Sequence, residues 1–122
     1  MTIGEAISRI DELVPNTYPA EQKIKWLSRM DMDIFESLIR THEDGIEEFN
    51  GYDGEVDMET ELLAPKPFAH IYDHYLESQI HYYNGDYSKF NNANGVLADD
   101  YRDMRNWYNR EHMPKGIRFT YF

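Results

Sequence analysis

Apolar residues recur at helical spacing in four stretches of the chain. Between residues 67 and 113 they repeat every three to four positions on both sides of Asn84-Gly85-Asp86. Gly85 can adopt the left-handed conformation that ends a helix, and the Asp86 carboxylate can cap the next one. A connection this short forces the two helices to run antiparallel. The pattern therefore predicts a helical hairpin over residues 67–113.

The N-terminal part, residues 1–42, predicts two further helices. Thr2 and Glu5 form a capping box in front of an apolar stripe that ends near Leu13. A second stripe runs from Pro19, which is well placed in the first turn of a helix, to about Thr41.

Asp31 interrupts the second stripe, because it falls in the middle of the apolar side of a continuous helix. A carboxylate buried there without a partner would cost several kcal/mol. Two arrangements would avoid this cost. The helix breaks and Asp31 caps a second segment, which is the arrangement we favour, or Asp31 meets a buried cation.

Residues 43–66 are predicted to form a long acidic loop, punctuated by glycines and without a basic residue before Lys66. A loop of this length in a compact domain is usually functional or disordered. Apolar residues indicate that it is anchored at points: Phe49, Tyr52, Leu62 and Leu63. Its carboxylates are Glu43, Asp44, Glu47, Glu48, Asp53, Glu55, Asp57, Glu59 and Glu61.

The tail, residues 114–122, ends in an alternating, β-favouring hexapeptide. In a strand, Ile117, Phe119 and Tyr121 would point one way, and Phe122 would point the other. Such a strand needs a partner edge, either within the acidic loop or on another subunit. The fold predicted for 1–122 is a single, mainly α domain: four to five helices built on the C-terminal hairpin, with a short C-terminal β-strand.

The net charge of −11 limits the function classes. Binding to a phosphate backbone relies on Lys and Arg, so an acidic chain is a poor candidate for DNA or RNA binding. The absence of Cys excludes disulfides and thiol chemistry. No signal-peptide pattern and no apolar run of ~20 residues occurs, so we expect neither secretion nor a membrane span.

One candidate metal site is present on the first hairpin helix. Three His and one Glu lie on one face there: His70, His74, Glu77 and His81. That face is opposite the apolar one and lacks the His-Glu-x-x-His order of metalloproteases. We therefore favour a polar outer face or a subunit contact over a metal site. No phosphate-binding loop or nucleophile motif is present, so we expect no cofactor and no enzymatic activity.

Three further residues are candidates for a subunit or partner interface, together with the tail. Trp26 lies opposite the apolar stripe of its helix, where it either contacts another subunit or packs under a loop. Gly95 costs stability in the middle of a helix, which either permits close approach of a neighbour or marks a weak segment. Trp107 adds apolar surface beyond the hairpin seam.

Several blocks of the chain, in order and over nearly its whole length, resemble a family of small proteins encoded in prophages of Gram-positive bacteria. They are Lys23-Ile24-Lys25-Trp26-Leu27-Ser28, Thr41-His42-Glu43, Phe49-Asn50-Gly51-Tyr52, Asp57-Met58-Glu59-Thr60-Glu61-Leu62-Leu63, Tyr75-Leu76-Glu77, Tyr108-Asn109-Arg110 and His112-Met113-Pro114-Lys115-Gly116. This family is similar to the head–tail connector, or adaptor, proteins of long-tailed phages.

The resemblance implies a virion structural protein without catalytic residues. Such a subunit forms a homo-oligomeric ring beneath the portal and contacts portal and neck or tail proteins. DNA passes through the ring without being bound specifically, and an acidic lumen would serve that role. The implied location is the virion, with assembly in the host cytoplasm.

A second function is compatible with the same acidity. An acidic regulatory protein can mimic DNA and occupy a basic site on a nucleic-acid-binding protein. Such a mimic would be a monomer or dimer with carboxylates spaced along one strip, whereas a connector subunit would form a ring.

Overall fold

The computed structural model describes residues 1–116. Its regular elements are α1 (Ile3–Leu13), α2 (Ala20–Ile34), a π-helical turn η1 (Phe35–Ile39), a 3₁₀ turn η2 (Lys66–Phe68), α3 (Ile71–Tyr83) and α4 (Tyr87–Glu111). In this part of the chain β pairing is limited to two isolated bridges, Thr2–Glu61 and His42–Pro114. The mainly α fold is confirmed. The predicted C-terminal strand lies outside the described residues.

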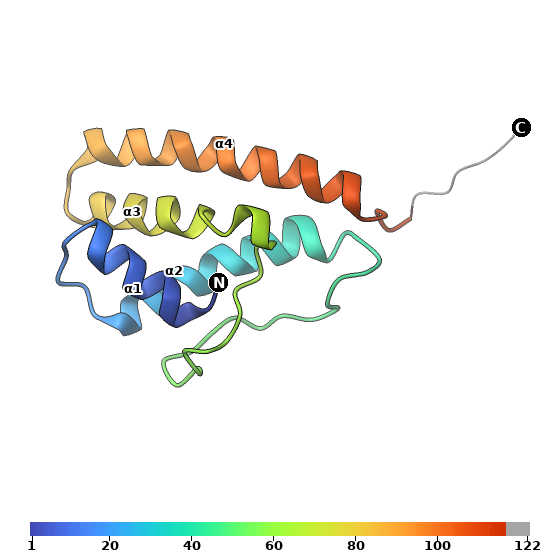
Figure 1. Ribbon diagram of the computed structural model, residues 1–122, viewed down its shortest axis with the longest axis horizontal. Coiled ribbons are helices and arrows are strands. Elements are labelled where there is room, and N and C mark those ends of the chain that lie inside the picture. The colour runs from blue at the N-terminus through green and yellow to red at the C-terminus, as the bar shows by residue number, and fades with distance from the viewer. Residues whose placement is uncertain (117–122) are drawn as a thin grey trace, which may run out of the picture.

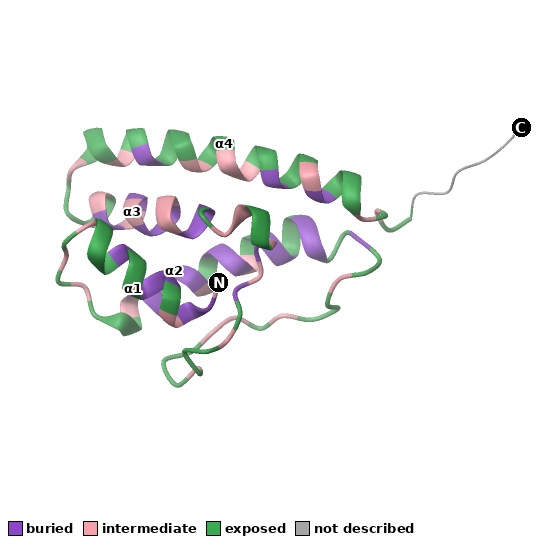
Figure 2. Ribbon diagram, in the orientation of Figure 1, coloured by how far each residue is buried: buried purple, intermediate pink, exposed green. Residues whose placement is uncertain are grey.

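Helix α3 occupies the centre of the molecule. It contacts α1 and α2 on one side and α4 on the other. Figure 1 shows α4 lying antiparallel to α3 as an outer layer, with α1 and α2 on the opposite side of α3. Because α3 is covered on both sides, most of its residues are buried or half-buried, whereas the outer face of α4 is exposed along its length (Figure 2).

The helix ends follow the predicted capping chemistry. In α1 the Glu5 amide donates to Thr2 Oγ1 at 3.1 Å, and the Thr2 amide donates to Glu5 Oε1 at 3.3 Å. At the hairpin turn Gly85 has φ of +78°, and Asp86 accepts a hydrogen bond from the Lys89 amide at 3.3 Å. The predicted hairpin is therefore confirmed, with the turn at the predicted residues.

Trp26 is part of the interior of the molecule, with 2% of its surface exposed. Its ring packs against Tyr18 of the α1–α2 connector, at 5.3 Å between centroids, and stacks on Tyr83 of α3 at 5.5 Å. Of the two predicted roles, packing under a loop is confirmed. A subunit contact through Trp26 is wrong, because Tyr18 and Tyr83 already cover the indole.

The acidic loop crosses the N-terminal end of α1 before it reaches the hairpin. Backbone amides of Ile3 and Gly4 donate to Thr60 and Met58 oxygens at 3.0 and 2.9 Å, and the Leu62 amide donates to Met1 at 2.9 Å. The four predicted anchor side chains are all at least partly buried: Phe49, Tyr52, Leu62 and Leu63. The loop is thus held to the helices at several points.

Asp31 holds the same loop from the middle of α2. Its Oδ2 accepts hydrogen bonds from the Tyr52 hydroxyl and from the Leu63 amide, the latter at 3.0 Å. Its Oδ1 accepts from the Tyr72 hydroxyl at 2.5 Å, and that hydroxyl in turn accepts from the Ala64 amide at 2.8 Å. The carboxylate therefore joins α2, α3 and two points of the loop.

The predicted helix break at Asp31 is wrong, because α2 is continuous through it. The predicted alternative, a buried cation, is also wrong, since neutral donors surround the carboxylate. Burial raises the pKa of Asp31, and the hydrogen bonds from Tyr52, Tyr72 and the Leu63 amide oppose that rise. Three neutral hydrogen-bond donors therefore compensate the buried carboxylate, and no cation is needed.

Replacing Asp31 by Asn should destabilise the protein by about 1–3 kcal/mol. An amide oxygen can still accept from two of the three donors, but the amide nitrogen then faces the third. Asp31→Leu should cost more, because all three donors lose their acceptor. Urea denaturation measures both changes. Asp33→Asn is the matched control on the exposed side of α2, where a change within ~0.5 kcal/mol is expected. Equal losses for Asp31→Asn and Asp33→Asn would contradict the described network.

Alanine substitutions at two glycines of the hairpin should change the stability of the protein in opposite directions. At Gly95 an added Cβ meets nothing within 4 Å, so Gly95→Ala should stabilise the protein by ~1 kcal/mol through helix propensity. At Gly85 the positive φ disfavours any Cβ, so Gly85→Ala should destabilise it by about 1–2 kcal/mol. Thermal denaturation followed by circular dichroism measures the stability of both variants. A loss of stability in Gly95→Ala would contradict the finding that the space around Gly95 is open.

Candidate binding groove

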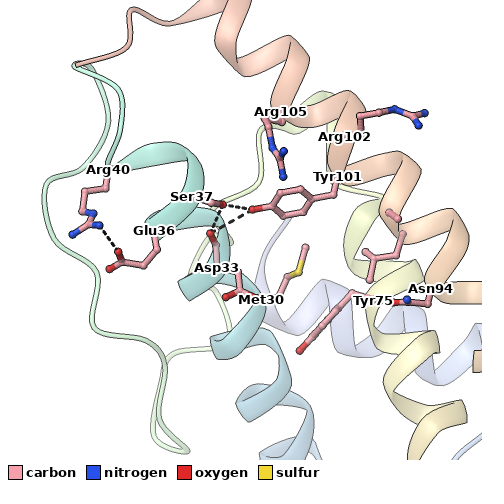
Figure 3. A pocket seen from close by; sticks show the side chains of 12 residues that line it. Met30, Asp33, Glu36, Ser37, Arg40, Tyr75, Asn94, Tyr101, Arg102 and Arg105 are labelled. Atoms are coloured by element: carbon pink, nitrogen blue, oxygen red, sulfur yellow. Dashed lines mark hydrogen bonds and ion pairs between the residues drawn. The ribbon is translucent and has the colours of Figure 1, made fainter. Parts of the chain in front are cut away.

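A groove of about 760 Å³ lies between the α2–η1 segment and α4, in the size range of ligand and peptide sites. Figure 3 shows the two walls facing each other, with Ser37 and Tyr101 linked across the groove. Apolar side chains lining it are Met30, Leu97 and Ala98. Polar and charged residues complete it: Asp33, Glu36, Ser37, Arg40, Tyr75, Asn94, Tyr101, Arg102 and Arg105.

The π-helical turn shapes one wall of the groove. It places Ser37 so that its hydroxyl donates to the Asp33 carbonyl at 2.6 Å and also contacts the Tyr101 hydroxyl of α4. Tyr101 additionally lies 3.4 Å from the same carbonyl. Single π turns within helices occur frequently at functional sites. Here the turn fixes the relative position of the two walls.

Tyr75 contributes to the groove from α3, beneath the two walls. Its side chain is buried, and its hydroxyl has no hydrogen-bond partner among the described residues. Burial raises the pKa of Tyr75, so the hydroxyl keeps its proton at any physiological pH. A buried hydroxyl without a partner costs free energy.

Three arginines line the groove, together with the carboxylates of Asp33 and Glu36. Arg40 pairs with Glu36 at 2.8 Å, and Arg102 lies 3.3 Å from Asp99 and 3.7 Å from Asp103. Arg105 differs from both. Its guanidinium lies 5.3 Å from the centroid of the Tyr101 ring, and within residues 1–116 it has no ion-pair partner. The groove therefore offers apolar walls next to an uncompensated guanidinium, which suits a segment that combines an apolar side chain with a carboxylate.

The predicted histidine face is only partly exposed: His70 and Glu77 keep 49% and 38% of their side-chain surface, whereas His81 keeps 12%. His74 contacts Asp100 of α4, and His70 Nε2 lies 3.5 Å from the same carboxylate. His81 Nε2 is 3.4 Å from Glu77 Oε1 on its own helix. Although His70 and His74 both approach Asp100, no group of three His, Asp or Glu side chains within the described residues has an arrangement that could hold a metal ion. This face of α3 instead helps to join the two hairpin helices.

The other predicted interface residues have different surroundings. Gly95 is exposed on the outer face of α4, beside exposed Val96. Trp107 is half-buried, with its ring centroid 5.7 Å from that of Phe68. The tail candidates, Ile117, Phe119, Tyr121 and Phe122, lie outside the described residues.

An aromatic cluster at the hairpin turn was not predicted. Tyr82, Tyr83 and Tyr87 are exposed to 47%, 51% and 60%, and Tyr82 contacts Tyr83, Tyr87 and Phe90 with centroids 5.2 to 6.0 Å apart. The signal was present as the close sequence spacing of these tyrosines around Asn84-Gly85. The groove gave no such signal, because its walls come from helices more than 50 residues apart in sequence.

Comparisons with known proteins found no match. No protein-family model, curated protein or solved structure matches the chain. In the described part of the chain, none of the helices combines the length and apolar character needed to cross a membrane.

Proposed function

We propose that the protein is a virion structural protein of a long-tailed phage, a head–tail connector or adaptor subunit. Copies of the chain form a ring beneath the portal, through which DNA passes without specific binding. The ring contacts portal and neck or tail proteins in the virion, after assembly in the host cytoplasm. No catalytic or cofactor role is part of this proposal.

The exposed aromatic cluster at the hairpin turn carries the proposal. Tyrosine is enriched in interface hot spots, because it buries a large apolar area and keeps a hydroxyl for hydrogen bonding. Tyr82, Tyr83 and Tyr87 offer such a surface at one end of an elongated hairpin, and Val96 adds exposed apolar surface on the outer layer. A subunit that functions within a larger assembly needs surfaces of this kind.

The charge of the chain supports the DNA-passage part of the proposal. At −11 the protein has few cations with which to release counterions from a phosphate backbone. Most of the exposed loop residues between Glu43 and Glu61 are acidic. A ring lumen lined by such residues repels DNA and lets it move.

The DNA-mimic alternative has less support. A mimic requires carboxylates that are free to meet basic groups along a strip. Several loop carboxylates already serve local contacts: Asp44 pairs with His112 at 2.5 Å, while Asp53 and Asp57 accept from the Glu55 and Glu59 amides at 2.9 Å. The Glu61 carboxylate meets the terminal amine of Met1 at 3.1 Å.

Purified protein at high concentration should form closed rings with a central hole. Negative-stain microscopy detects the rings, and light scattering coupled to size exclusion gives their mass. Tyr82→Ser combined with Tyr87→Ser should weaken the assembly and leave the helical content unchanged, which circular dichroism measures. A protein that stays monomeric or dimeric at every concentration would favour the DNA mimic instead.

The protein should not retain duplex DNA, even at low salt where backbone contacts are strongest. The reason is the electrostatic repulsion between the acidic surface and the phosphates. A gel-shift assay with protein at ~100 µM covers the usual range of non-specific affinity. A shifted band at that concentration would contradict passage without binding.

A further inference from the structure

The acidic loop presents one apolar side chain between carboxylates. Ile46 is 47% exposed, and it is followed by Glu47 and Glu48, which are also exposed. Isolated exposed apolar residues are common on protein surfaces. Ile46 is distinguished by the way in which the chain on both sides of it is fixed.

On the N-terminal side, three contacts hold the loop against the end of α4 and the π turn. His112 Nδ1 lies 2.5 Å from Asp44 Oδ2, and this hydrogen bond lowers the pKa of Asp44. The Glu43 amide donates to the Met113 oxygen at 3.0 Å. Gly45 lies so close to Ile39 that an added Cβ would come within 2.5 Å of its Cγ2 atom.

On the C-terminal side, Phe49 returns to the core. Its ring packs edge-on against Phe35 of the π turn at 6.1 Å and against Tyr52 at 5.2 Å between centroids. Ile46, Glu47 and Glu48 therefore form a short projecting segment, residues 46–48, between two anchored ends. A segment fixed before binding loses less conformational entropy when it binds.

The groove between α2–η1 and α4 has the complementary chemistry. Its apolar residues, Met30, Leu97 and Ala98, match an aliphatic side chain. Within residues 1–116 Arg105 has no ion-pair partner, and segment 46–48 offers two carboxylates. Ile46 does not line the groove of its own chain. We propose that segment 46–48 of one copy docks into the groove of a second copy, with Ile46 against Leu97 and Met30 and its carboxylates on Arg105.

This contact deepens the proposed function and rests on it, because it supplies the interface between ring neighbours. Each copy would use its segment towards one neighbour and its groove towards the other. A contact between two different surfaces of identical subunits is heterologous, and repetition of a heterologous contact closes into a ring when the rotation allows. Burying the aliphatic side chain gives affinity, and the pairing of the segment's carboxylates with Arg105 adds charge complementarity to the contact.

Charge reversal in the full-length chain tests the contact. Arg105→Glu should weaken self-association at least ~10-fold, because like charges then oppose each other at the rim. The pair Glu47→Lys and Glu48→Lys should do the same. Combining all three substitutions in one chain should restore association. Sedimentation velocity over a concentration series measures each association constant, and circular dichroism verifies folding.

Matched controls remove the effect of net charge. Arg110→Glu makes the same charge change on an exposed position of α4 outside the groove. Glu55→Lys with Glu59→Lys makes the same change elsewhere in the acidic loop. Neither control should reproduce the loss seen at Arg105 or at segment 46–48.

The outcomes separate the contact from the ring. Wild-type assembly that responds equally to Arg105→Glu and Arg110→Glu overturns this contact and leaves the connector proposal intact. Dimers that require Arg105 and segment 46–48, without rings, support the contact and overturn the connector proposal. A wild-type protein that remains monomeric overturns both.

Discussion

The buried carboxylate of Asp31 is the constraint on which the arrangement of the chain depends. It lies at 0% exposure in an unbroken helix, where desolvation would be costly without hydrogen bonds. The donors that compensate come from α3 and from two separate points of the long loop, Tyr52 and Leu63. A fully satisfied polar network in a low-dielectric interior strongly favours one arrangement of its members. Asp31 therefore fixes the path of a segment that has no regular secondary structure.

The consequences of this anchoring extend to the candidate interaction surfaces. Tyr52 connects the Asp31 network to Phe49, and Phe49 packs on the π turn that forms a wall of the groove. The projecting segment and the groove are thus both connected to the Phe35–Ile39 turn. In the proposed assembly, a change in the core near Asp31 would disturb both sides of the subunit contact through this connection.

Much of the fold could be predicted from the sequence, because its signals are local. The Thr2–Glu5 capping box, the Gly85 turn and the anchoring role of Phe49 and Leu62 all follow from spacing and residue type within a few positions. The role of Asp31 could not be predicted in this way. Helical arithmetic identified it as an anomaly, but its partners Tyr52, Leu63 and Tyr72 lie 21, 32 and 41 residues away. A local explanation, the helix cap, was therefore preferred and was wrong.

The candidate sites show the same division between local and distant signals. Trp26 was predicted to lie opposite the apolar stripe of α2, but Tyr18 and Tyr83 bury it from outside that helix. Asp100 of α4 approaches both His70 and His74, whereas His81 approaches Glu77 of its own helix. The groove joins Ser37 to Tyr101, 64 residues apart, and no pattern within one helix contains that contact.

The charge distribution adds a requirement that any assembly of this chain must meet. Subunits that each carry −11 repel one another, so non-specific contact between copies is disfavoured. Repulsion between exposed charges is screened beyond ~10 Å at 0.1 M salt, whereas a desolvated pair in contact is screened much less. Association is therefore favoured only where a cation and a carboxylate meet directly and apolar area is buried beside them. In the proposed contact, Arg105 with the neighbouring Leu97 and the segment Ile46-Glu47-Glu48 would satisfy both conditions. Overall repulsion combined with one complementary contact would then allow ordered assembly and disfavour indiscriminate aggregation.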